Sequence, residues 1–204
     1  SASSVDYLAG LLTSAARPAI VLGSAIDTVG ANGAAVALAE NTGSDVYLAS
    51  SPYRLPFPNK HGLFQGVLPA SIQGINTTLE DYDVVLVIGA PVFRYHQHEP
   101  DRYLGEHVNF IHITDDPNEA ARAPFGTSIV TNIKRAVELL AEAVTASAHT
   151  VEVLPQDYPS TEPPTDGVFD PARVFSLLRQ HAPTDASYVV ESTSTNSAFW
   201  DQMD

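Results

Sequence analysis

The sequence predicts an α/β protein, a doubly wound Rossmann-like sandwich of three layers with a mostly parallel sheet, followed by an incomplete C-terminal segment. Short apolar runs alternate with helix-like segments through residues 1–147, which is typical of β-α-β units. The run Val84–Ile88 is apolar at every position, as are strands covered on both faces of a parallel sheet. A chain of 204 residues, 44% of them hydrophobic, can bury the core that this fold requires.

The first part of the chain contains two helix-strand pairs. Apolar side chains recur at helical spacing through residues 4–16, and a strand is predicted directly after them at 19–23. An alanine-rich helix is expected over 30–41, with a strand at 46–48. Residues 49–70 hold four prolines and two glycines and are expected to form a long loop, of the kind that is more often functional than idle.

The next part continues the alternation. A short helix is expected at 71–79, and the clearest amphipathic helix of the chain spans 132–147. Between these helices, strands are expected at 84–88, 109–113 and 128–130. The sequence Asp115-Asp116-Pro117 is interpreted as a turn.

The C-terminal quarter has a different composition. Residues 148–167 are rich in proline and acidic residues and are interpreted as an extended linker. A new unit is expected over 168–204, with a helix that begins at Pro171 and a strand at 188–190. One helix and one strand bury too little surface for a domain. The expectation is therefore that the sequence is a fragment that ends inside its last domain.

Charge and composition exclude several classes of protein. The net charge of −14 disfavours nucleic-acid binding, because an acidic surface repels phosphate. Residues 148–204 carry nine acidic residues and two arginines, a pattern typical of a solvated tail or linker. The lack of cysteine excludes disulfides and thiolate chemistry, and no apolar run is long enough to span a membrane. A cytoplasmic location is expected.

The loop after the strand 84–88 contains the main candidates for chemistry. His96 could exchange a proton near neutral pH, and Arg94 could bind a carboxylate or pair with a nearby acid. His96 and His98 are spaced like metal ligands, but no further ligand completes the set, so no metal site is predicted. The run Gly23–Asp27 lacks the glycine pattern of a dinucleotide site. The polar run Glu191–Asn196 could hold phosphate oxygens or be an ordinary loop.

Four runs of the sequence resemble, in the same order, the benzoylformate decarboxylases of the thiamine-diphosphate-dependent enzyme family. They are residues 56–61, 84–97, 116–124 and 191–195. Subunits of that family have three α/β domains, and the resemblance implies that residues 1–147 are the middle domain. Residues 168–204 then correspond to the beginning of the third domain, which holds the cofactor diphosphate and a magnesium ion.

The resemblance also implies roles for individual residues of a longer parent enzyme. His96 matches a catalytic histidine, and Glu191, Thr193 and Ser194 match a segment that lies against the cofactor. The parent would use thiamine diphosphate and magnesium to decarboxylate an aromatic 2-oxo acid, benzoylformate to benzaldehyde and CO2, and would be a homotetramer.

The chain lacks both the glutamate that activates the cofactor and the magnesium motif, so it is expected to bind no cofactor and to be inactive alone. The alternatives are a fragment of another 2-oxo acid decarboxylase, of an acetolactate-synthase-like carboligase, or a binding or scaffold module without chemistry.

Overall fold

The computed structural model describes residues 2–92, 103–144, 157–163, 167–192 and 194–203. The chain divides into two compact units, Ser1–Leu154 and Pro155–Asp204, and each is described by itself. None of the helices in these described ranges is long and apolar enough to cross a membrane.

The first unit is built on a six-stranded sheet with the strand order β3-β2-β1-β4-β5-β6. The strands are β1 (Pro18–Leu22), β2 (Asp45–Leu48), β3 (Phe64–Val67), β4 (Val84–Ile88), β5 (Asn109–Thr114) and β6 (Thr127–Val130). Every neighbouring pair is parallel. The chain moves outward from β1 in one direction and then, from β4, in the other, which is the doubly wound order. The predicted fold class is confirmed.

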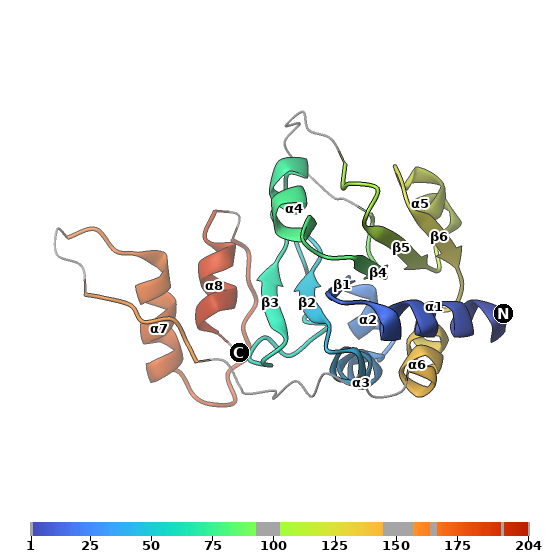
Figure 1. The fold of residues 1–204 in the computed structure, drawn as a ribbon. Helices are drawn as coiled ribbons and strands as arrows, with labels where there is room; N and C mark the ends of the chain where they lie inside the picture. The colour runs from blue at the N-terminus through green and yellow to red at the C-terminus, as the bar shows by residue number, and fades with distance from the viewer. Residues whose placement is uncertain (1, 93–102, 145–156, 164–166, 193, 204) are drawn as a thin grey trace. The chain divides into compact units, whose positions relative to one another are not determined.

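Helices cover both faces of this sheet. They are α1 (Ala2–Ser14), α2 (Ala25–Thr28), α3 (Asn32–Thr42), α4 (Ile72–Leu79), α5 (Pro117–Arg122) and α6 (Ile133–Ala143). Helices α1, α3 and α6 pack on one face, and α4 and α5 lie on the other (Figure 1). The three layers are those predicted.

Burial on both faces explains the apolar composition of the central strands. All five residues of β1 and all five of β4 are buried. In β4, Leu86 and Ile88 join the core cluster under α1, α3 and α6, whereas Val85 and Val87 join the cluster under α4. Because successive side chains of a strand point to opposite faces, a strand between two cores must be apolar throughout.

The long loop expected over residues 49–70 is in part wrong, because it contains β3. Val46 pairs with Phe64 and Leu48 with Val67, and the register shifts between these two pairs. Gly66, with φ +107°, lies in that irregular stretch. Glycine and an irregular register hide this edge strand from sequence patterns, since only its pairing with β2 makes it a strand.

The turn expected at Asp115-Asp116-Pro117 is the beginning of a short helix, α5. The Asp116 carboxylate accepts a hydrogen bond from the Asn118 amide at 2.8 Å, and Pro117 occupies the first helical position. An aspartate cap followed by proline is a helix-start signal, so the sequence contained the information for this element.

The second unit contains two helices, α7 (Pro171–His181) and α8 (Asn196–Gln202), and an aromatic cluster around Phe199. The predicted start of α7 is confirmed, because the Asp170 carboxylate caps the Ala172 amide at 3.1 Å. The strand expected at 188–190 is wrong. In the described part of this unit no other strand is available to pair with it, and Val189 is 99% exposed.

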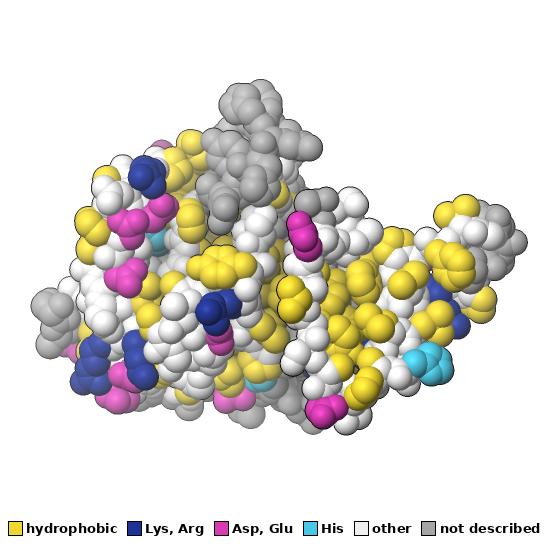
Figure 2. All heavy atoms as spheres, turned by 180° about the vertical axis from the view of Figure 1, so that it is seen from behind, with side chains coloured by type: hydrophobic (Ala, Val, Ile, Leu, Met, Phe, Trp, Pro, Cys, Tyr) yellow, Lys and Arg dark blue, Asp and Glu magenta, His cyan; other side chains and the backbone are white. Residues whose placement is uncertain are grey.

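Hydrophobic side chains gather on the surface of the second unit (Figure 2). The large exposed ones are Val168, Phe169, Val174, Leu178, Val189 and Val190. The unit therefore buries only part of its own apolar surface.

Candidate functional site

The carboxyl ends of β1 and β4 meet where the strand order reverses, which is the usual ligand position in open α/β sheets. Here the two strand ends approach each other closely. The Gly23 amide donates to the Ile88 carbonyl at 2.8 Å, and a Cβ atom on Gly23 would lie 2.0 Å from the Gly89 carbonyl oxygen. Gly89 has φ +67° and turns the chain across the strand end.

The segment after β2 closes the same edge of the sheet. The Tyr53 amide donates to Ser24 Oγ at 3.2 Å. The Asp27 carboxylate accepts a hydrogen bond from Arg54 Nη1 at 3.0 Å and, on its other oxygen, from Asn32 Nδ2 at 3.1 Å. Both oxygens of Asp27 are therefore engaged within the protein.

The chain that leaves β4 leads to the predicted catalytic residue. Ala90 and Val92 are buried, with 7% and 4% of their surface exposed. His96 and Arg94 lie outside the described residues, as does His98. The structure therefore describes only the first residues of this segment, Gly89 to Val92, which we call its root, and not His96.

A buried histidine holds this root. His112 of β5 is 0% exposed, and its Nε2–H donates to the Ala90 carbonyl at 2.8 Å. Its Nδ1 lies 3.3 Å from Ser128 Oγ, which donates to it when the ring is neutral. Burial lowers the pKa of His112, and the Ala90 hydrogen bond and the charge of Glu119 oppose that shift. The neutral ring with the proton on Nε2 satisfies both contacts.

The sequence did not single out His112 as a functional candidate. Its signal was a lone polar residue inside the apolar run of β5 (Asn109–Thr114). Such a residue must find a buried partner, because an unpaired imidazole in a core is costly.

The predicted cofactor contacts lie in the second unit, between α7 and α8. Glu191 and Ser194 are exposed, and Thr193 lies outside the described residues. The hydroxyls of Ser192 and Thr195 hydrogen-bond to each other. Hydroxyl groups are suitable donors to phosphate oxygens, so the segment fits one side of a diphosphate site, although the Glu191 carboxylate would repel the phosphates if it faced them.

A magnesium site is a different matter. Among the described residues there is no group of three or more His, Cys, Asp or Glu side chains that could hold a metal ion. The described part of the chain supplies hydroxyl donors for a diphosphate but no ligand set for its cation.

Comparison with known proteins gives the context of this geometry. Residues 5–140 match the model of the thiamine pyrophosphate enzyme central domain. The chain is 44% identical, over 95% of its length, to benzoylformate decarboxylase from Pseudomonas aeruginosa strain PAO1. It spans only 36% of the length of that relative.

Solved structures give the same result. The 4-hydroxybenzoylformate decarboxylase of Rhodococcus jostii RHA1 is 46% identical with a TM-score of 0.92, over 100% of this chain and 38% of that one. Benzoylformate decarboxylase from Polynucleobacter necessarius is 27% identical with a TM-score of 0.89, over 98% of this chain and 38% of that one. The chain therefore belongs to the thiamine pyrophosphate enzyme family, and residues 5–140 form its central domain.

Proposed function

We propose that this chain is part of a thiamine diphosphate-dependent lyase that converts benzoylformate to benzaldehyde and CO2. The observation that carries the proposal is the 44% identity to a benzoylformate decarboxylase over 95% of the chain. That similarity extends past the central domain at residues 5–140 into the second unit. The chain alone, with 36% of the length of that relative, is proposed to be inactive.

The reaction breaks the bond between the keto carbon and the carboxylate, and a proton takes the place of CO2 on that carbon. Bound thiamine diphosphate supplies the electron sink for this step. His96 is proposed to provide the proton, because imidazole titrates near the working pH. Glu191, Thr193 and Ser194 are proposed to lie against the cofactor. The magnesium ion, the homotetramer and the cytoplasmic location also remain predictions.

The test compares the whole protein with two histidine variants. With thiamine diphosphate and magnesium, the whole protein should release benzaldehyde from benzoylformate. His96→Ala should lower kcat by about 100-fold, which is the typical contribution of a proton-transfer residue. His107→Ala is the matched control, because His107 bonds the Glu80 carbonyl, which follows α4 at the opposite edge of the sheet. Full activity of His96→Ala would contradict the role of His96.

The 204-residue chain is the second control. Calorimetric titration with thiamine diphosphate and magnesium should show no binding to it. Tight magnesium-dependent binding would contradict the prediction that this part alone binds no cofactor.

A second substrate has its own support. The Rhodococcus enzyme of 46% identity is described as acting on 4-hydroxybenzoylformate. The ratio of kcat/KM for benzoylformate and its 4-hydroxy derivative decides between the two. A preference for aliphatic 2-oxo acids, or formation of acyloins, would point instead to another decarboxylase or a carboligase. No turnover at all would favour a binding module.

A further inference from the structure

The four residues from Gly89 to Val92 form the root of the segment that carries His96. Hydrogen bonds from β5 hold the first two of them. The Gly89 amide donates to the Ile113 carbonyl at 2.9 Å. The Ala90 carbonyl accepts from His112 Nε2 at 2.8 Å. Both bonds are made by adjacent residues of β5. This one strand therefore holds the backbone on either side of the Gly89–Ala90 peptide, where the chain leaves the sheet.

The next residues restrict the root further. Pro91 has no amide hydrogen and a fixed φ, and Val92 is buried in the cluster under α4. The chain therefore leaves the strand in one direction. Ala90 precedes His96 by six residues in the sequence, so the held peptide lies at the start of the chain that leads to His96.

The bond from His112 to Ala90 is difficult to replace. His112 is fully buried, so water cannot take over either the imidazole N–H or the Ala90 carbonyl when the other is removed. Three neighbours specify how the ring stands. Ser128 Oγ contacts Nδ1, the Ala90 carbonyl accepts from Nε2, and Glu119 on α5 is the charged group that acts on the ring.

We infer that His112 is a positioning residue of the lyase, which holds the Ala90 peptide at the start of the segment that carries His96. This inference rests on the proposed function. It assigns no chemical step to His112, which acts through the backbone alone. The inference predicts that replacing His112 lowers turnover and not substrate binding, because ångström-scale misplacement of a reacting group lowers kcat.

The first test uses the 204-residue chain and needs no activity. His112→Phe keeps an aromatic ring but removes the donor. Hydrogen exchange of the Gly89 amide should become at least about tenfold faster in this variant. His112→Gln, whose amide can donate to Ala90, should exchange within about twofold of the parent chain, as should His107→Phe. Unchanged exchange at Gly89 in His112→Phe would overturn the inference.

The second test uses the whole protein with benzoylformate, thiamine diphosphate and magnesium. His112→Phe should lower kcat by about tenfold with KM within about twofold, and His112→Gln should restore most of the loss. His107→Phe should match the parent protein. If His96→Ala is inactive but His112→Phe is fully active, the inference is overturned and the proposed function stands. If the parent protein decarboxylates no 2-oxo acid, the proposed function fails and the catalytic part of the inference fails with it.

Discussion

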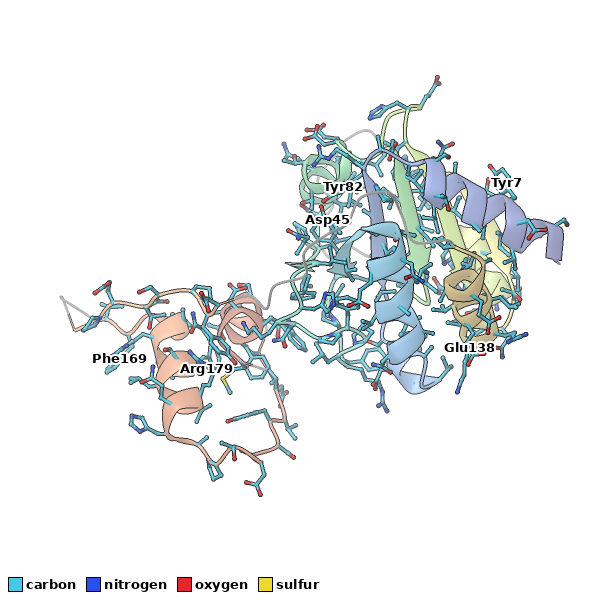
Figure 3. All side chains as sticks on the ribbon, turned by 60° about the horizontal axis from the view of Figure 1, so that its bottom comes forward. Tyr7, Asp45, Tyr82, Glu138, Phe169 and Arg179 are labelled. Carbon is cyan, nitrogen blue, oxygen red and sulfur yellow. The ribbon has the colours of Figure 1, made fainter. Side chains whose placement is uncertain are left out.

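Tyr82 is a buried residue, between α4 and β4, that hydrogen-bonds to two residues of β2. Its hydroxyl donates to the Asp45 carboxylate at 2.7 Å and lies 3.0 Å from the Tyr47 hydroxyl. Asp45 and Tyr82 stand together near α4 in Figure 3. Burial raises the pKa of Tyr82 well above its usual range, and the hydrogen bonds to Tyr47 and Asp45 add to that shift. The hydroxyl is thus a neutral structural donor.

Replacing this hydroxyl tests its contribution to stability. Tyr82→Phe should lower the free energy of unfolding by about 1–2 kcal/mol, because the partly buried Asp45 loses a donor. Urea denaturation measures the change. Tyr7→Phe is the matched control, since Tyr7 is 64% exposed, and should change stability by less than about 0.5 kcal/mol. Equal effects of the two substitutions would contradict the role given to Tyr82.

The buried imidazole of His112 predicts a pH dependence of stability. Its pKa is lowered in the folded state, so the unfolded chain takes up the proton first as pH falls. The stability that the neutral ring contributes is complete above about pH 6.5, the value for an unperturbed histidine, and is lost as pH falls below it. Unfolding free energies at about pH 7.5 and about pH 5 measure this loss.

His112→Gln separates this effect from all other titrations. The variant keeps a donor for Ala90 but does not titrate, so it should lose less stability than the parent chain between the two pH values. At about pH 8, where histidine is neutral, the unfolding free energies of the two proteins should differ only by the part of the substitution's effect that does not depend on pH. Identical pH dependence in both would show that His112 does not titrate on unfolding.

At the scale of elements, the ends of β1 and β4 approach each other closely at Gly23 and Gly89. Gly23→Ala should destabilise the protein by about 3 kcal/mol or more, because the new methyl group meets the Gly89 backbone. Gly10→Ala in α1 is the opposite case, since a Cβ there meets nothing within 4 Å. It should stabilise the protein by about 0.5–1 kcal/mol. Thermal unfolding compares the two, and tolerance of Gly23→Ala would contradict this packing.

The elements also show what the sequence could and could not predict. Val84–Ile88 is the strand predicted, to the residue, because burial on both faces leaves a continuous apolar run. β3 was missed because its strand character depends on β2, a neighbour that no local pattern reveals. The strand expected at 188–190 failed for the converse reason. Its residues have strand propensity, but the described part of the second unit provides no partner strand.

The candidate site was predicted less completely than the fold. The strand-end loops directed attention to His96 and to residues 191–196, and the family resemblance added their roles, which no contact among the described residues tests. His112 was missed because its partner Ala90 lies 22 residues away in the chain. A contact across two strands depends on their register, which sequence patterns do not give.

At the scale of the whole molecule, stability should reside in the first unit. The buried residues of both core clusters lie between Leu8 and Val144. A chain that ends at residue 154 should therefore unfold cooperatively, with a Tm within about 3 °C of the full chain. The isolated segment 155–204 should show no cooperative transition, because it leaves large apolar side chains exposed. Calorimetry of both pieces tests this, and a large loss of Tm on truncation would contradict it.

The close approach of the ends of β1 and β4 limits how this part of the domain can evolve. A side chain at position 23 would meet the Gly89 backbone, and that backbone continues directly into Ala90 and the chain toward His96. A substitution of Gly23 would thus displace the backbone from which that chain starts. Descendants of this domain that keep the proposed lyase activity should therefore keep glycine at this position.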